Sequence, residues 1–343
     1  MKKVTYSFII LLAGIILLTA FTCHKATAPN TNNEPVFAKG ADIGWLTEME
    51  SSGKKFYNAA GQEQDCIQLL KDLGMNSIRL RVWVNPANNW NNTADVVAKA
   101  VRAKAKGMRV MIDFHYSDSW ADPGQQTKPA AWANLNLTDL QNAVYTHTYQ
   151  VLTTLKQNGV IPAWVQIGNE TNNGMLWPTG MASQSMSNFA SLLKQGYNAT
   201  KEVDSTIQVI VHLSNGYDNS MYKWMFDGLQ ANGVKWDIIG MSLYPPYNDW
   251  KIKNEQCLVN MNDMLSRYGR PIMICEVGMS WDQPDSSYAF LKDIISKTKS
   301  LGATRGLGVF YWEPECMPGW NGYTLGSFDN SNKPTKALNA FNN

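Results

Sequence analysis

Short apolar segments alternate with amphipathic stretches along most of this chain. The apolar segments begin near Ala38, Ser77, Arg109, Ala163, Gln208, Ile238, Pro271 and Gly306. Each interval between successive starts is long enough for one strand, one helix and two loops, which is the spacing that parallel strands require. Eight such units predict a single α/β domain, a closed (β/α)8 or TIM barrel, rather than a doubly wound open sheet.

The stretches between the apolar segments have the periodicity of helices that cover one face of a sheet. The clearest examples are Gln64–Leu73, Ala94–Ala105 and Ala143–Leu155. Each has apolar residues at helical spacing, and a glycine follows within a few positions, where a helix commonly ends. The recurring order of strand, helix, glycine and strand favours the barrel.

The N-terminus differs from the rest of the chain. Residues 1–22 start with lysines and continue through the apolar run Phe8–Thr19, which predicts an export signal. The residues before Cys23 loosely match a bacterial lipoprotein processing site, so we expect a lipid on Cys23 that anchors an exported, outer-membrane lipoprotein at the cell envelope. Residues 23–36 are polar and predict a flexible tether, and residues 37–343 form the expected catalytic domain.

Charge and composition limit the class of ligand. The formal net charge is +2, and no run of lysine and arginine is present, which argues against a nucleic-acid partner. The chain instead contains 13 Trp and 14 Tyr. Their flat apolar rings match the C–H faces of sugars, although we expect about half of the rings to lie in the core. We expect a monomer.

Four cysteines follow Cys23 in the chain. They are Cys66, Cys257, Cys275 and Cys316. Buried free thiols and one disulfide are both compatible with their positions in the expected helices and strands.

Two of the expected strands end in a glutamate. The fourth reads W-V-Q-I-G-N-E-T-N and brings Glu170, and the seventh reads P-I-M-I-C-E-V-G and brings Glu276. Because the carboxyl ends of all barrel strands meet at one face, the two side chains should lie opposite each other. Retaining glycosidases need two carboxyl groups about 5–5.5 Å apart, one as acid/base and one as nucleophile.

The acid/base and the nucleophile require different pKa values. We predict that Glu170 is the acid/base, with a pKa raised by an apolar site and a neighbouring carboxylate. We predict that Glu276 is the nucleophile, with a pKa lowered by Arg79.

Polar and aromatic residues crowd the ends of the other strands. We expect substrate contacts from Arg79, Asp113, His115, Trp120, Asn169, Tyr244 and Trp312, with Asp42 and Arg81 beside them. Asn169 would bind the 2-hydroxyl of the sugar. Trp312 would form the floor beneath the cleaved sugar, and Trp120 would line the groove further out. Trp83 either lines the same groove or packs behind its strand.

Other catalytic chemistries fit the sequence poorly. His115 and Asp113 share a strand face, but the chain has only four His, too few for a multi-histidine metal cluster. No G-x-S-x-G turn is present for a serine nucleophile. We therefore expect neither a catalytic metal nor a required cofactor.

Several segments resemble glycoside hydrolase family 53. They are K-G-A-D-I-G-W-L-T-E-M-E, S-I-R-L-R-V-W-V-N-P, D-F-H-Y-S-D-S-W-A-D-P-G-Q-Q, W-V-Q-I-G-N-E-T-N and G-V-F-Y-W-E-P-E. The resemblance spans about Lys39 to Phe341. It implies a retaining (β/α)8 endo-β-1,4-galactanase that acts on β-1,4-galactan, type I arabinogalactan and galacto-oligosaccharides. It also implies Glu170 as acid/base, Glu276 as nucleophile, and Arg79, Asn169, Tyr244 and Trp312 around the cleaved bond.

The chain departs from the family pattern after its seventh and eighth expected strands. Bacterial relatives carry a long calcium loop where Gly278–Tyr288 is short, so calcium is doubtful, although Asp282, Asp285 and Asp329 leave a reduced site open. The segment Pro314–Phe328 is also short.

Two alternative functions remain. Another activity of the same clan, such as a mannanase or cellulase, is disfavoured by the motif from Asp113 to Gln126. A non-catalytic sugar-binding barrel is disfavoured because both carboxylates are present.

Overall fold

Parallel strands paired in sequence order form the centre of the molecule. The computed structural model describes residues 1–3 and 36–342. Its eight strands close into a barrel, with β8 pairing with β1. They are β1 (Ala38–Asp42), β2 (Ser77–Val82), β3 (Arg109–Phe114), β4 (Trp164–Ile167), β5 (Gln208–Leu213), β6 (Ile238–Leu243), β7 (Ile272–Val277) and β8 (Gly306–Tyr311). The predicted barrel is confirmed, and only β4 and β7 begin one residue later than expected.

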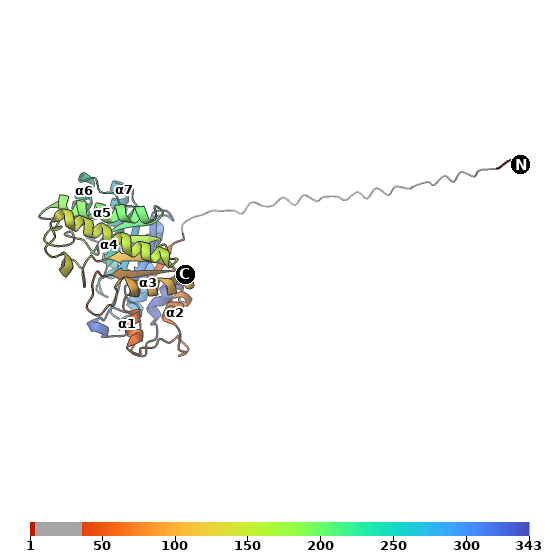
Figure 1. Ribbon diagram of the computed structural model, residues 1–343. Helices are drawn as coiled ribbons and strands as arrows, with labels where there is room; N and C mark the ends of the chain where they lie inside the picture. The colour runs from red at the N-terminus through yellow and green to blue at the C-terminus, as the bar shows by residue number, and fades with distance from the viewer. Residues whose placement is uncertain (4–35, 343) are drawn as a thin grey trace. The chain divides into compact units, whose positions relative to one another are not determined.

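Helices surround the barrel (Figure 1). They are α1 (Leu46–Ser51), α2 (Cys66–Asp72), α3 (Thr93–Ala105), α4 (Leu137–Gln157), α5 (Met186–Val203), α6 (Asn219–Ala231), α7 (Trp250–Tyr268) and α8 (Pro284–Ser300). Three short 3-10 helices are η1 (Ala130–Trp132), η2 (Trp320–Gly322) and η3 (Lys336–Asn342). Helix α4 starts earlier than its apolar pattern predicts, because the Asn136 side chain accepts a hydrogen bond from the Asp139 N–H at 3.0 Å and caps it.

The barrel interior is apolar in one layer and polar in the next. The apolar layer consists of Ala38, Met111, Trp164, Ile210, Ile238, Met273, Cys275 and Phe310. Residues two positions apart on a strand share a face. Met111, Trp164 and Ile210 are therefore followed on the same face by polar residues, namely Asp113, Gln166 and His212. The alternation ends in a polar layer at the carboxyl ends of the strands.

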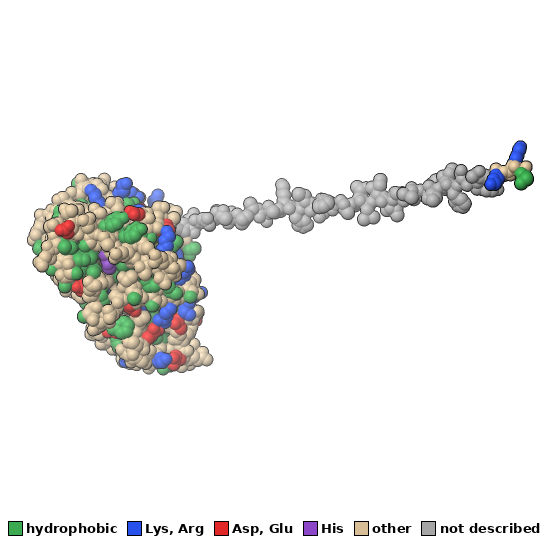
Figure 2. All heavy atoms as spheres, viewed as in Figure 1, with side chains coloured by type: hydrophobic (Ala, Val, Ile, Leu, Met, Phe, Trp, Pro, Cys, Tyr) green, Lys and Arg blue, Asp and Glu red, His purple; other side chains and the backbone are tan. Residues whose placement is uncertain are grey.

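The four cysteines of the described chain, Cys66, Cys257, Cys275 and Cys316, are free and buried. Of the two alternatives for these thiols, the structure therefore contains no disulfide. Cys23 and the predicted export signal lie outside the described residues. Within residues 1–3 and 36–342, no helix is both long and apolar enough to cross a membrane. Figure 2 shows lysine and arginine side chains interspersed with acidic ones over the visible face.

Candidate active site

Arg79 is the centre of the polar layer at the carboxyl ends of the strands. Its side chain projects inward from β2 and is 0% exposed. Its guanidinium nitrogens lie close to Asp42 (2.6 Å), Gln166 (3.0 Å), Asp113 (2.8 Å), Asn169 (2.9 Å) and Glu276 (2.8 Å). One buried cation on β2 thus connects five groups from four other strands and their ends. Such a network fixes the orientation of each member more tightly than a single contact would.

Glu276 lies at the end of β7 with two donors on its carboxyl group. Arg79 lies 2.8 Å from one oxygen, and the Tyr244 hydroxyl donates to the other at 2.8 Å. Burial raises the pKa of Glu276, and this outweighs Arg79 and Tyr244, which lower it. The predicted net decrease of this pKa is therefore wrong, although Arg79 acts in the expected direction.

Glu170 follows β4 on a tight turn. Its backbone has the positive φ of 44°, unusual for a residue with a side chain, and Gly168 just before it has a φ of 85°. The turn directs the Glu170 backbone N–H to the His212 ring, 3.3 Å away. Burial, and secondly the charge of Glu276, raise the pKa of Glu170 to about 8. This direction agrees with the sequence expectation, and it leaves Glu170 protonated at neutral pH.

Asn169 is positioned by the loop that follows β3. Its amide oxygen accepts from Arg79, and its amide nitrogen donates to the Ala121 carbonyl at 2.8 Å. The Gln126 side chain donates to the Asn169 backbone carbonyl at 2.8 Å. The side chain thus reaches the surface of the site in one fixed orientation.

Asp113 and His115 lie beneath this surface. His115 Nδ1 accepts hydrogen bonds from the Trp83 indole and the Ala121 N–H, both at 3.1 Å. The His115 proton must therefore be on Nε2, which contacts Asp113 at 3.0 Å.

Three of the predicted substrate contacts are corrected by this burial. Arg79 and Asp113 are 0% exposed, and both ring nitrogens of His115 are already occupied. The polar side-chain atoms of these groups are therefore bound to protein partners. They hold Glu276, Asn169 and Trp83 in place instead. Sequence spacing placed them correctly at the strand ends but could not show their depth.

A second buried cation, Arg81, supports the aromatic side of the site. Its guanidinium lies 4.5–5.8 Å from the ring centroids of four tryptophans. They are Trp45, Trp83, Trp120 and Trp312, which pack edge-on or tilted against one another. Glu313, 0% exposed, binds the Arg81 guanidinium. Buried cations gain appreciably from such ring faces.

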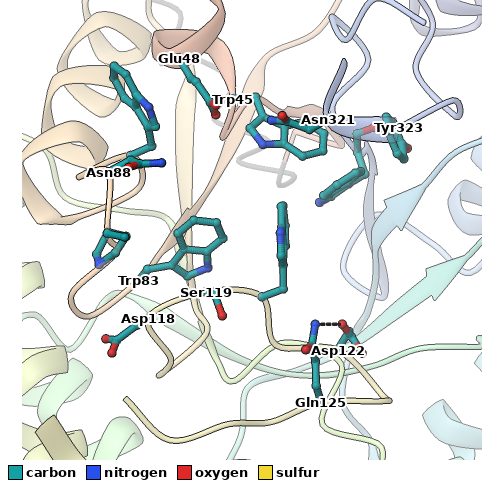
Figure 3. Close-up of a pocket in the computed structure, with 16 residues that line it drawn as sticks. Trp45, Glu48, Trp83, Asn88, Asp118, Ser119, Asp122, Gln125, Asn321 and Tyr323 are labelled. Atoms are coloured by element: carbon teal, nitrogen blue, oxygen red, sulfur yellow. Dashed lines mark hydrogen bonds between the residues drawn. The ribbon is translucent and has the colours of Figure 1, made fainter. Parts of the chain in front are cut away.

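A cavity of about 570 Å³ opens beside these rings. All four tryptophans line it together with Tyr323, Asn321 and Asp118, and Figure 3 shows Trp45 and Trp83 on its wall. Trp83 therefore faces the groove, which settles the alternative that the sequence left open. Neither Glu170 nor Glu276 lines the cavity. It thus forms an aromatic extension beside the glutamate pair rather than the site of the pair itself.

Comparison with known proteins identifies the family. The family model described as glycosyl hydrolase family 53 matches residues 38–341. The chain belongs to glycosyl hydrolase family 53. The resemblance seen in the sequence is therefore confirmed, and this family 53 chain is a glycoside hydrolase.

Similar proteins cover nearly the whole family 53 domain. The probable arabinogalactan endo-β-1,4-galactanase A of Neosartorya fischeri is 34% identical over 330 residues, which cover 89% of this chain and 90% of that protein. The arabinogalactan endo-β-1,4-galactanase of Cellvibrio japonicus is 32% identical and covers 96% of this chain and 95% of its own. A solved fungal β-1,4-galactanase superposes with a TM-score of 0.82 at 30% identity, over 89% of this chain and 98% of that one.

The residues considered for calcium do not gather in this family 53 barrel. Asp282 accepts from Ser280 at 2.7 Å, Asp285 pairs with Lys336 at 2.5 Å, and Asp329 accepts two backbone N–H groups of its own turn. Within residues 1–3 and 36–342, no three His, Cys, Asp or Glu side chains form a metal group. Because calcium requires several convergent oxygens, this donor set does not fit it.

Sequence reasoning missed His212, Ser242 and Glu313, which all belong to the buried polar network. His212 contacts Gln166 at 2.9 Å and Ser242 at 2.7 Å. A polar residue inside an apolar strand was the available signal, as in the run V-I-V-H-L that contains His212.

Proposed function

We propose that this family 53 chain is a retaining endo-β-1,4-galactanase that cleaves within β-1,4-galactan and type I arabinogalactan. In this proposal Glu276 is the nucleophile and Glu170 is the acid/base. The observation that carries the assignment is the contrast between the two carboxyl groups. Burial raises the pKa of both, but Glu276 contacts Arg79 and Tyr244, which lower its pKa, whereas the pKa of Glu170 is raised to about 8. One ionised and one protonated carboxyl group is the state that a retaining glycosidase needs at the start of its cycle.

In the first step, a Glu276 oxygen attacks the anomeric carbon. The bond from that carbon to the leaving oxygen breaks, and the leaving oxygen takes the Glu170 proton. The product is a galactosyl ester of Glu276. Arg79 and Tyr244 hold the attacking carboxylate in one orientation, each at 2.8 Å, so that little motion is needed before attack.

In the second step, Glu170 is a carboxylate and acts as the base. It removes a proton from water while the water oxygen attacks the anomeric carbon, and the ester bond to Glu276 breaks. Glu276 becomes a carboxylate again and Glu170 is protonated again. Two inversions at one carbon restore the β configuration, which ¹H NMR of the first product detects directly. An α product would contradict the mechanism.

The remaining surface groups bind the sugar in this proposal. Asn169 holds the 2-hydroxyl, Tyr244 orients Glu276, and Trp312 stacks under the reacting sugar. The tryptophan-lined cavity of about 570 Å³ accommodates further sugars of the polymer. Sugars with flat C–H faces suit this aromatic lining.

The substrate is tested by measuring reducing ends released from galactan, mannan and cellulose. We expect release from galactan alone, with a mixture of oligosaccharide lengths early in the reaction, because an endo enzyme cuts at internal bonds. Preferential cleavage of mannan or cellulose would overturn the substrate assignment. Release from no polymer, by a folded enzyme, would favour the sugar-binding barrel.

The roles of the two glutamates are tested by Glu170→Gln and Glu276→Gln. Both variants should fold and lose most activity on galactan. Glu170→Gln should still react once with an activated aryl galactoside, because its leaving group needs little protonation, and should then stall. Glu276→Gln should not react with it. If the two variants behave alike on this substrate, the roles are wrongly assigned.

We also propose that the enzyme is exported and held at the cell envelope by a lipid on Cys23. The support is the sequence of residues 1–23, with a basic start, an apolar run and a cysteine.

A further inference from the structure

His212, near the end of β5, contacts the backbone of the proposed acid/base Glu170 and the side chain of Ser242. The side chain is 0% exposed. Its Nε2 lies 2.7 Å from the Ser242 hydroxyl, and its Nδ1 lies 2.9 Å from Gln166 Nε2 and 3.3 Å from the Glu170 backbone N–H. His212 thus contacts the backbone of Glu170 directly and Ser242 on the neighbouring strand β6.

The neighbours of His212 determine which nitrogen carries its proton. The Gln166 amide oxygen accepts from Arg79 at 3.0 Å, and its nitrogen donates to Asp113 at 2.8 Å, which fixes the direction of the amide. Gln166 Nε2 therefore donates to His212 Nδ1, as does the Glu170 N–H. The Asn169 amide oxygen also lies 3.1 Å from His212 Nδ1, but the two N–H donors require this nitrogen to be an unprotonated acceptor. The proton must then be on Nε2, which donates to Ser242.

His212 stays neutral in this arrangement. Burial first, and then the positive charge of Arg79, hold the pKa of His212 well below its ordinary value. Protonation of Nδ1 would also break the two hydrogen bonds that it accepts. His212 is therefore neutral at neutral pH and donates to Ser242.

Ser242 passes this constraint on to Glu170. Its oxygen accepts from His212 at 2.7 Å, so its own proton is free to be donated, and Ser242 lowers the pKa of Glu170, as a hydrogen-bond donor to that carboxyl group would. The β6–β7 register shifts between Met241 and Ser242, which sets Ser242 opposite Glu276 at the end of the barrel. Such irregularities commonly redirect a side chain next to an active site.

We propose that His212 and Ser242 form a positioning relay that orients the Glu170 carboxyl group and sets the upper pH limit of catalysis. The inference rests on the proposed function of Glu170 as acid/base. His212 Nε2–H donates to Ser242, and the Ser242 hydroxyl donates to Glu170. Because a hydrogen bond to a carboxylate favours its ionised form, the relay holds Glu170 acidic enough to release its proton to the leaving oxygen.

The other groups that act on Glu170 come from several elements. The charges of Glu276 on β7 and Asp122 after β3 raise the pKa of Glu170, and Arg79 on β2 lowers it. Tyr222 on α6 and Tyr244 after β6 also face it, but burial raises the pKa of both phenols well above 10, so they remain neutral. None of these groups is altered by a change at Ser242. A shift in the Glu170 titration would therefore report the relay itself.

The test is the pH profile of kcat/KM for Ser242→Ala on galactan. The variant lacks the donor to Glu170, so the pKa of Glu170 should rise and the alkaline limb should move up by about one pH unit, the equivalent of one charge-assisted hydrogen bond. The acid limb, which reports Glu276, should stay in place. A purely structural role would lower kcat/KM equally at every pH and leave both limbs where they are, and that result would overturn the proposal.

Ser214→Ala is the matched control. Ser214 lies just after β5, is also buried, and bonds to Asn172 at 2.6 Å rather than to Glu170. This variant removes the same hydroxyl group from the same end of the barrel. Its pH limbs should match those of the wild type. A shift equal to that of Ser242→Ala would show that any lost hydroxyl moves the profile, and would contradict the relay.

A second pair of variants tests the histidine. His212→Gln retains an N–H donor near the position of Nε2 and should keep the alkaline limb within a few tenths of a pH unit of the wild type. His212→Leu removes the donor and should shift the limb as Ser242→Ala does. Identical limbs in the two His212 variants would overturn the relay, even if Ser242→Ala does not fold. A folded wild type that cleaves no galactan would instead refute the proposed function.

Discussion

The Arg79 guanidinium lies 2.8 Å from the Glu276 carboxylate, and the same cation contacts Asp42 at 2.6 Å and Asp113 at 2.8 Å. A single positive charge thus faces three buried acids. Burial raises the pKa of Asp42 to about 8, so Asp42 is protonated at neutral pH and carries no charge. The Arg79 charge is then shared by Asp113 and Glu276. The positive charge of the buried Arg79 can therefore still lower the pKa of Glu276, because its other acidic partners do not fully neutralise it.

The Tyr244 hydroxyl is the second donor to Glu276, and its removal should shift the acid side of the pH profile. In Tyr244→Phe, Glu276 loses a hydrogen bond that favours its ionised form, so the pKa of Glu276 rises. The acid limb of kcat/KM should move to higher pH, and kcat should fall about tenfold. Tyr247→Phe, on a 52% exposed tyrosine three residues further along the same loop, is the control and should have no effect. An unmoved acid limb in Tyr244→Phe would contradict the contact.

Ionisation of the Glu170 carboxyl group should destabilise the folded protein as the pH rises. Its pKa is about 8 in the folded protein and about 4.5 when unperturbed. Between these values the unfolded chain releases a proton that the folded protein retains, so the free energy of unfolding falls as pH rises and levels off above about pH 8. Glu170→Gln removes this titration. Its Tm should equal that of the wild type near pH 4 and exceed it by several degrees at pH 8, as measured by calorimetry. A difference independent of pH would show that Glu170 is not a perturbed acid.

Trp312 and Trp120 should affect different kinetic constants. The Trp312 backbone N–H donates to the carbonyl of Val277, the residue after Glu276, at 2.9 Å, so Trp312→Ala should lower kcat on galactan as well as raise KM. The loss in transition-state stabilisation should exceed the roughly 0.5–1.5 kcal/mol of a single ring contact, because the same ring also positions the sugar. Trp120→Ala should mainly raise KM, as loss of uniform binding does. If Trp312→Ala changed KM alone, its ring would not lie beneath the reacting sugar.

Cys23→Ala should release an active enzyme from the membrane fraction. The proposed lipid on Cys23 is the anchor, because each buried CH₂ of an acyl chain adds about 0.8 kcal/mol to membrane binding. Fractionation followed by a galactan assay of each fraction makes the measurement. A variant that still sediments with membranes would contradict the lipoprotein assignment.

The barrel was predictable because strand periodicity is a local property of the sequence. Ala38, Ser77, Arg109, Gln208, Ile238 and Gly306 all begin strands as expected. Glu170 and Glu276 were found for the same reason, since each is a charged residue at the end of an apolar run. The closed topology then brings both to one face.

The burial of the site residues and the identity of their contacts could not be predicted from their spacing in the sequence. Arg79 and Arg81 are two residues apart on one strand, yet Arg79 binds carboxylates while Arg81 is surrounded by tryptophan rings. The partners come from β1, β3, β7 and β8, and their distances depend on how the barrel closes. The direction of the pKa shift of Glu276 was predicted wrongly, because burial, which the sequence does not show, outweighs the neighbouring cation.

Trapping the covalent ester between Glu276 and the sugar is the decisive test of Glu276 as the nucleophile. A 2-deoxy-2-fluoro galacto-oligosaccharide with a dinitrophenyl leaving group should inactivate the enzyme. The fluorine slows both steps, and the dinitrophenyl leaving group restores the rate of the first step only, so the ester accumulates. Peptide mass spectrometry should then find one sugar on the peptide that contains Glu276, and none in Glu276→Gln. A sugar attached to Glu170 or to another carboxylate would contradict the account.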